Sequence, residues 1–284
     1  MIRRVPVEGA GRWLSRDTVR VFSPNLGGVA LLAVAALAGL ATIASGATLL
    51  AGYGVFVSVC VALLALWWMK ALRTLRRHNA AVTALGAGDH EGARTTFDEV
   101  VSGLTPVGYA APSLHNLGYL AQLEGDFRES AALLAAANAA LDGNRSPQLR
   151  PLVALIRARW AMSLARVGQL DEAEALVADL PVDTPESRAL SVLARAFVDH
   201  LRGRHEAVVA QLDHARPLLL RCLVGFNAAT AAALEALSVR QLDGIYRGAA
   251  RRSAELPCSE PMRAMVDRLL PGATTVLPRG EAWS

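Results

Sequence analysis

The amino-acid sequence predicts an all-α protein, in which a transmembrane helical hairpin near the N-terminus is followed by stacked helical hairpins. Three observations support this fold class. Apolar residues make up 53% of the 284 residues and aromatic residues only 5%, with alanine and leucine dominant, which favours helices over strands. A long segment near the N-terminus has no charged residue, and a short motif with a glycine recurs along the rest of the chain.

Residues 1–24 form a basic segment that we expect on the cytoplasmic side of a membrane. The net charge of +4 lies entirely in the first 70 residues, where six basic residues face two acidic ones (6 − 2 = 4), while residues 71–284 hold 23 Arg and 23 acidic residues. This balance gives no basic face for nucleic acid, so no nucleic-acid partner is expected. Before the apolar segment we expect either a short surface-lying helix or a disordered basic tail; such a helix would carry on one side Arg12, Arg16 and Arg20.

Residues 21–69 contain no Asp, Glu, Lys or Arg, so a helix there has no polar face and must be hidden from water on all sides. Residues 25–44 (20 residues) and 47–69 (23 residues) are each long enough to cross a hydrocarbon core of about 30 Å. We expect two transmembrane helices with a turn at Ser45 and Gly46. Small side chains would let them approach closely, namely those of Gly28, Ala35, Gly39, Gly52 and Gly54.

The flanking charges predict the orientation of this hairpin. Arginines precede the first span, basic residues follow the second, and the turn has no charge, so both termini are expected in the cytoplasm. Trp67 and Trp68 would lie at the headgroup level. The candidate contacts with anionic lipid headgroups are Lys70, Arg73, Arg76 and Arg77.

A cleaved signal peptide ending near Ala44, Ser45 and Gly46 is the competing interpretation of the first apolar run. That run is longer than an ordinary signal core, and a second run with a basic stop follows it. A single Lys beside 28 Arg, with abundant Ala, is typical of a GC-rich bacterial genome. The expected location is therefore a bacterial inner membrane, which the chain crosses twice.

Beyond the membrane segment, a glycine followed by a polar residue separates short apolar helices four times. The pairs are Gly88-Asp89, Gly125-Asp126, Gly168-Gln169 and Gly203-Arg204, with glycines 37, 43 and 35 residues apart. A helix that ends at Gly needs a residue tolerant of positive φ, and Asp favours the start of the next helix. Each pair therefore predicts the bend of a helical hairpin, and hairpins of this kind bury their apolar faces by stacking.

Residues 74–216 resemble the tetratricopeptide repeat (TPR) family. The best match covers residues 113–144, with its consensus slots filled by Leu117, Gly118, Ala121, Gly125, Ser130, Leu134 and Ala137. The match is looser in the first unit, whose leading helix is expected to continue from the second span. The resemblance implies an α-solenoid over residues 70–222, after which residues 223–271 would be degenerate or capping helices and residues 272–284 a tail.

In this family the first helix of each hairpin lines a concave groove that receives a partner's peptide. Carried onto this chain, the resemblance nominates groove residues His78, Asn79, His115, Asn116, Tyr119, Gln122, Arg159, Met162, Arg166, Phe197 and His200. Asn116 and Arg159 occupy slots where carboxylate-clamp members hold Asn and Arg, but three other slots depart from that pattern, with His78, Val82 and Leu155. Each of these positions has a solvated or packing role as its alternative.

No catalytic, metal-binding or cofactor-binding site is predicted. His200, His205 and His214 lie on both sides of a bend, so their spacing does not match one helical face. Asp171, Glu172 and Glu174 begin a helix, where acidic side chains favour the macrodipole. Motifs for a phosphate loop or a nucleophile elbow are missing from the sequence.

These features predict a non-enzymatic, membrane-anchored scaffold that binds proteins or peptides at the cytoplasmic face and can self-associate. Anchoring would raise the effective concentration of the groove for membrane-bound partners. A non-catalytic subunit of a transport or envelope-assembly complex is the alternative.

Overall fold

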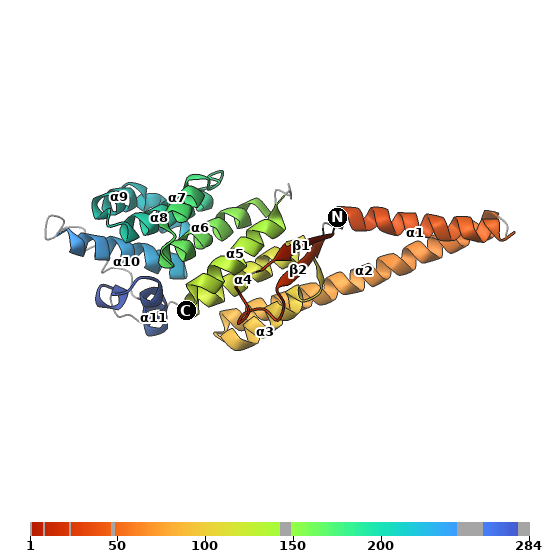
Figure 1. The fold of residues 1–284 in the computed structure, drawn as a ribbon, viewed down its shortest axis with the longest axis horizontal. Helices are drawn as coiled ribbons and strands as arrows, with labels where there is room; N and C mark the ends of the chain where they lie inside the picture. The colour runs from red at the N-terminus through yellow and green to blue at the C-terminus, as the bar shows by residue number, and fades with distance from the viewer. Residues whose placement is uncertain are drawn as a thin grey trace.

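The computed structural model describes residues 2–7, 9–22, 24–46, 49–142, 149–242 and 258–277, and the side chains at 2, 24–32 and 49–50 lie outside that description. The described part is all-α, with 77% helix, eleven α-helices and three short strands. Figure 1 shows two long helices projecting from one end of a helical body. The predicted fold class is therefore confirmed as all-α.

The projecting helices, α1 (Pro24–Ala44) and α2 (Leu49–Gly86), are packed against each other. A Cβ on Gly39 would lie 3.3 Å from the Gly52 carbonyl oxygen, and a Cβ on Gly52 would lie 2.5 Å from Ile43 Cγ1. Ala35 is fully buried, while Gly54 faces open space and the side-chain environment of Gly28 lies outside the description. Small residues therefore permit close helix contact at Gly39 and Gly52.

One described helical stretch, Ala51–Gly86, is long and apolar enough to cross a membrane. Its most apolar 18 residues have a mean hydropathy of 2.1, and none of them is buried within the structure. In α1 the described apolar stretch Ala33–Ala44 is shorter. Large apolar side chains are exposed along both helices, including Leu37, Val61 and Trp68. Helix α2 continues beyond this apolar part to Gly86 as one 38-residue helix, as the sequence predicted for the leading helix of the first unit.

Four successive helix pairs form most of the body. Their bounds are α2 with α3 (His90–Val101), α4 (Val107–Glu124) with α5 (Phe127–Leu141), α6 (Arg150–Arg166) with α7 (Leu170–Ala178), and α8 (Pro185–Leu201) with α9 (His205–Cys222). The four glycines at the bends have φ of 80°, 87°, 86° and 75°. This confirms the prediction that each bend needs a left-handed residue.

The four bends share one hydrogen-bond pattern, which explains the recurrence in the sequence. Each glycine N–H donates to the carbonyl three residues earlier, as Gly125 does to Gln122, and the next N–H donates to the carbonyl five residues before it, as Asp126 does to Ala121. This is the Schellman arrangement, which satisfies the last carbonyls of a helix. At the first bend the Asp89 side chain also caps α3 by accepting from the Gly92 N–H.

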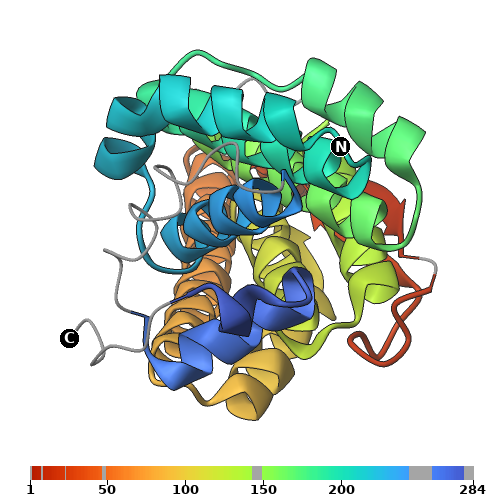
Figure 2. The same cartoon turned by 90° about the vertical axis from the view of Figure 1, so that its left-hand side faces the viewer.

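The C-terminal elements return to the second helix pair of the body. Helix α10 (Gly225–Gln241) packs on α8 and α9, and α11 (Glu260–Leu269) packs on α10 and on α4. Figure 2 shows α10 and α11 inside the arc made by the preceding helices. Residues 272–277, predicted as part of a tail, include the short helix η3 (Ala273–Thr275) and two buried side chains, Ala273 and Leu277; residues 278–284 lie outside the description.

The N-terminal segment differs from both predictions made for it. It forms β1 (Ile2–Pro6) and β2 (Thr18–Phe22), which pair antiparallel, and β2 also pairs in parallel with β3 (Leu104–Pro106). A surface-lying helix and a disordered tail are therefore both wrong for the described residues. Alternate side chains pack into the core of α3 to α5, namely Val5, Val7, Val19 and Val21, as the period of a strand requires.

The turn between β1 and β2 is attached to the helical body by polar contacts. Trp13 is 2% exposed, and its Nε1 donates to Asp126 Oδ2 at 3.2 Å. Arg12 Nη1 donates to the same carboxylate at 2.7 Å, and the Arg3 guanidinium donates to the Ala140 carbonyl at 2.9 Å. The segment before α1 and the helices after α2 therefore form one folded unit.

Candidate functional site

The candidate residues from the sequence fall mainly on the leading helices α4, α6 and α8, which pack side by side in chain order. Helix α10 extends this row by packing on α8. The leading helices thus form one continuous face, and a peptide groove of the predicted kind would lie on this face.

At the α2 end, the two predicted residues have different surroundings. His78 Nδ1 lies 2.9 Å from Ser113 Oγ, and its ring contacts the rings of Phe97 and Tyr109 at 5.7 and 6.1 Å. Burial lowers the pKa of His78, so its neutral form is favoured. Asn79 is exposed. His78 therefore packs between α2 and α4, and only Asn79 is open to solvent.

At the centre of the face, Gln122 and Arg159 join α4 to α6. Gln122 is 1% exposed; its Nε2 donates to the Arg159 carbonyl at 3.0 Å and to Ser163 Oγ at 2.8 Å. Its Oε1 accepts from Arg159 Nη1 at 3.1 Å. Ser130 extends this network, since its hydroxyl donates to the Gly118 carbonyl at 2.8 Å and lies 2.9 Å from Ser163 Oγ. A buried polar network of this kind fixes how two helices align.

Arg159 is a buried cation held by aromatic rings. It is 7% exposed, and its Cζ lies 4.0 Å from the Tyr119 ring centroid and 5.9 Å from that of Phe226. Within the described residues it forms no ion pair with a carboxylate, and its Nε has no partner. Burial lowers the pKa of Arg159, but arginine keeps its charge in proteins, and the ring faces stabilise it.

His115 lies close to this cation and is also buried, at 6% exposure. Burial, and secondarily the charge of Arg159, lower the pKa of His115 to about 3. Its Nδ1 lies 3.1 Å from Asn116 Oδ1, so the neutral ring donates from Nδ1 and leaves Nε2 as an acceptor. Among the described atoms that Nε2 has no partner. Asn116 is half-buried.

The remaining candidates lie farther along the face. Met162 and Phe197 are 1% and 0% exposed and belong to the core. The Arg166 guanidinium stacks on Phe127, 4.9 Å from its centroid, and donates to the Arg268 carbonyl at 3.4 Å. His200 Nδ1 lies 2.9 Å from Ser238 Oγ of α10.

The C-terminal helices cover this face. Phe226 of α10 lies against Tyr119 of α4, with centroids 5.9 Å apart in a T-shaped arrangement. Arg268 of α11 donates to the carbonyl of Leu123 at the end of α4. Most of the nominated side chains therefore contact other parts of the same chain. Peptide binding at them stays a prediction, and it would require α10 and α11 to move.

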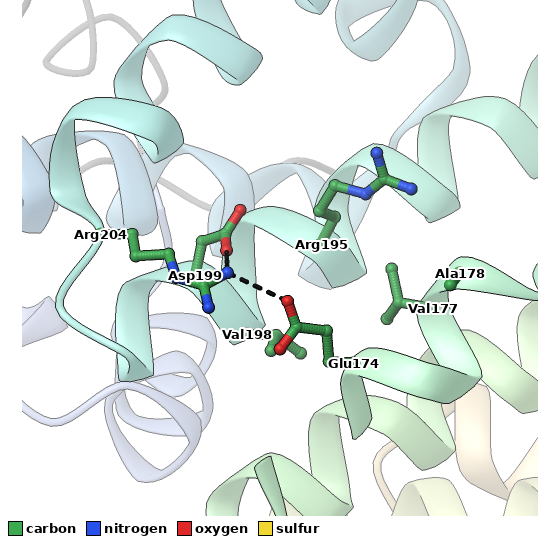
Figure 3. Close-up of a pocket in the computed structure, with 7 residues that line it drawn as sticks. All are labelled: Glu174, Val177, Ala178, Arg195, Val198, Asp199 and Arg204. Atoms are coloured by element: carbon green, nitrogen blue, oxygen red, sulfur yellow. Dashed lines mark hydrogen bonds and ion pairs between the residues drawn. The ribbon is translucent and has the colours of Figure 1, made fainter. Parts of the chain in front are cut away.

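A separate cavity of about 230 Å³ opens beside α7 and α8 (Figure 3). Its lining comprises Glu174, Val177, Ala178, Arg195, Val198, Asp199 and Arg204. The Arg204 guanidinium bridges Glu174 and Asp199, at 3.0 and 3.1 Å, and its hydrogen bond lowers the pKa of Glu174. Arginine thus favours the ionised form of Glu174 and pairs with Asp199, which suits a structural ion-pair network between helix pairs rather than general acid catalysis.

The four basic residues nominated for lipid headgroups lie on α2 just beyond its apolar part. Lys70, Arg73, Arg76 and Arg77 are all exposed, and Arg77 forms a loose ion pair with Glu99 at 3.9 Å. Strands β1 and β2 bring further arginines to the same end of the body. From the sequence, a helix or a disordered tail was expected in this segment. The alternation of valines was the signal that could have indicated strands.

In comparisons with known proteins, no family model, no curated protein and no solved structure matches this chain. Within the residues that the structure describes, no cluster of three His, Cys, Asp or Glu side chains could hold a metal ion.

Proposed function

We propose that this protein is a membrane-anchored scaffold that mediates protein–protein interactions at the cytoplasmic face of a bacterial inner membrane. The observation that carries the proposal is the continuity of α2. This helix has exposed apolar side chains in its first part and continues without interruption into the first helix pair of the body. An exposed apolar helix is stable in lipid but not in water, so the body would be held rigidly next to the bilayer.

The N-terminal sheet supports a two-span anchor over a single span. The segment before α1 packs on the helices that follow α2, through the cores of β1, β2 and α3 to α5. Both segments must therefore lie on the same side of any membrane. If α2 crosses the bilayer, α1 must cross it in the opposite direction.

The lengths of the two helices agree with this arrangement. Helix α1 has 21 residues. The part of α2 that precedes its first charged residue, Lys70, begins at Leu49 and also has 21 residues (70 − 49 = 21). At about 1.5 Å per residue each rises about 31 Å, close to the thickness of a hydrocarbon core. The basic residues from Lys70 onward would then lie among cytoplasmic headgroups, where anionic lipid attracts them.

The repeated helix pairs support a TPR-like α-solenoid as the interaction domain. Four bends share one geometry, and the leading helices lie side by side, which is the arrangement that stacked hairpins need. A bound partner would meet the leading helices after displacement of α10 and α11, or it would contact the body from outside. Tyr119, Asn116 and Arg159 would be the centre of the first kind of site.

A topology experiment tests this proposal. In a background with Cys60, Cys222 and Cys258 replaced by Ala, Ser45→Cys in the turn is expected to react with a membrane-impermeant maleimide in intact cells. Thr18→Cys, on the exposed side of β2, is expected to react only after permeabilisation. Equal reactivity of the two cysteines in intact cells, or recovery of the chain in the soluble fraction without detergent, would contradict the membrane-anchored scaffold.

A non-catalytic subunit of a transport or envelope-assembly complex is the second candidate, favoured by the same exposed apolar faces of α1 and α2, which can pack on other spans as well as on lipid. The native mass after mild detergent extraction distinguishes the two. A monomer or homo-oligomer supports the scaffold, whereas a fixed assembly with other membrane proteins supports the subunit.

A further inference from the structure

Two arginines lie directly opposite each other on the outer side of the N-terminal sheet. Arg4 of β1 and Arg20 of β2 are register partners in the antiparallel pair. Both are exposed, while their neighbours Val5, Val19 and Val21 point into the core. Side chains at opposed positions have Cβ atoms about 5 Å apart, so the two guanidinium groups share one patch of surface.

Neither guanidinium is neutralised by a residue that the structure describes. Among the described residues, the side chains of Arg4 and Arg20 have no hydrogen-bond or ion-pair partner. Arg3 and Arg12 differ, because Arg3 donates to the Ala140 carbonyl and Arg12 pairs with Asp126. Like charges at directly opposed positions destabilise a strand pair, so this pair would gain stability from an anion bound between the two side chains.

The position of the pair indicates which anion. Arg20 lies two residues before Phe22, the end of β2, and α1 begins at Pro24. Arg20 is four residues before Pro24 (24 − 20 = 4), and four extended residues span at most about 13 Å, whereas a headgroup layer is about 5 to 8 Å thick on each side of a bilayer. Figure 1 shows β1 and β2 at the end of the body from which α1 and α2 project. If α1 enters the membrane at Pro24, the arginine pair lies in the headgroup layer or at its outer edge, next to the lipid phosphates.

We propose that Arg4 and Arg20 form a binding site for the phosphate of an anionic phospholipid headgroup. This inference rests on the proposed membrane anchor and adds a second, sheet-borne contact to the basic residues of α2. A guanidinium presents two parallel N–H donors to phosphate oxygens, so two opposed arginines can hold one phosphate from both sides. The sheet would then fix the rotation of the helical body against the bilayer surface, since a helix pair alone leaves that rotation free.

The test uses the full-length protein in vesicles of phosphatidylcholine, with and without phosphatidylglycerol. The readout is the thermal unfolding temperature of the helical body, because a ligand that binds only the folded state raises it. For the wild type, phosphatidylglycerol is expected to raise this temperature. The double variant Arg4→Gln with Arg20→Gln is expected to show a smaller rise, because only the basic residues of α2 still contact the anionic headgroups. In phosphatidylcholine alone it should unfold at the same or a higher temperature than the wild type, because the repulsion between the two arginines is removed.

A charge-matched control distinguishes a specific phosphate site from general electrostatic attraction between the protein and anionic lipid. Arg16→Gln with Arg128→Gln removes two exposed arginines that also have no described partner, and it is expected to keep the full rise. The same loss in both double variants, or the same rise in wild type and Arg4→Gln with Arg20→Gln, overturns the headgroup site. The single variants Arg4→Gln and Arg20→Gln provide the comparison if the double variant does not fold.

The two proposals fail in distinguishable ways. If the wild type does not incorporate into vesicles at all, the membrane anchor is wrong. If it incorporates and its unfolding temperature does not depend on phosphatidylglycerol, the anchor stands and the headgroup site is wrong.

Discussion

Gly118 is the residue on which the contact between α4 and α5 depends. A Cβ at this position would lie 2.7 Å from Leu134 Cγ, and Leu134 is fully buried, so neither helix has space to yield. We expect Gly118→Ala to lower the free energy of unfolding by about 1–3 kcal/mol, the usual cost of overpacking a core. Chemical denaturation followed by circular dichroism measures this change.

Gly108 is the matched control on the same helix. A Cβ there meets no atom within 4 Å, so Gly108→Ala is expected to leave stability unchanged or slightly higher, as alanine favours helices. Similar losses for the two substitutions would show that helix α4, rather than its contact with Leu134, is sensitive to the side chain.

His200 makes the stability of the body depend on pH. Burial, and secondarily the charge of His205 at a ring distance of 5.1 Å, lower the pKa of His200 from 6.5 to about 4. The unfolded chain therefore binds more protons than the folded one between these values, so the stabilisation present above pH 6.5 is lost as the pH falls toward about 4. His115, whose pKa is lowered to about 3, acts in the same direction.

Replacement of His200 tests this pH dependence. His200→Gln is expected to flatten part of the fall in the denaturation midpoint across that acidic range, while His214→Gln, at an exposed position of α9, should leave the slope unchanged. An unaltered slope in His200→Gln would assign the acid sensitivity to other groups.

Single residues also show what the sequence could and could not predict about the candidate site. The four bend glycines were predictable because positive φ is a local requirement. The burial of Gln122 and Arg159 was not, because a polar side chain at a groove position has the same sequence signature whether it faces solvent or a covering helix. The cover comes from Phe226, 67 residues after Arg159 (226 − 159 = 67).

At the scale of elements, helices followed from the sequence more closely than strands. Each helix closes its own hydrogen bonds and carries its own apolar period, so α4 to α9 meet in pairs at the predicted bends. Strand β2 pairs with β3 more than eighty residues later, with Arg20 opposite Leu104. A five-residue strand is stabilised by such distant partners, which no local pattern shows. The sequence therefore predicted a surface-lying helix or a disordered tail for this segment, although Val19 and Val21 alternate with polar residues.

At the scale of the whole molecule, the C-terminal helices connect the last helix pair of the body to the second. Arg268 of α11 donates to the Leu123 carbonyl, 145 positions apart in the chain, and α10 lies between α8 and α11. Residues 223–271 were predicted as degenerate or capping helices, without a position in the fold. Their position over α4 depends on the curvature of the array, which local sequence patterns do not encode.

Phe226 is the side chain through which this closure is most directly tested. It is 6% exposed and contacts Tyr119 and Arg159 on the far helices, so Phe226→Ala removes the contact that holds α10 over α4. We expect a loss of about 3 kcal/mol or more in unfolding free energy, with faster amide hydrogen exchange in α10 and α11 than in α4 to α6. Val224→Ala, at a position 80% exposed two residues earlier, is the control and should change neither. Unchanged exchange in α11 of Phe226→Ala would mean that α11 holds its place over α4 independently of α10, and that the face of the leading helices is closed by two separate contacts.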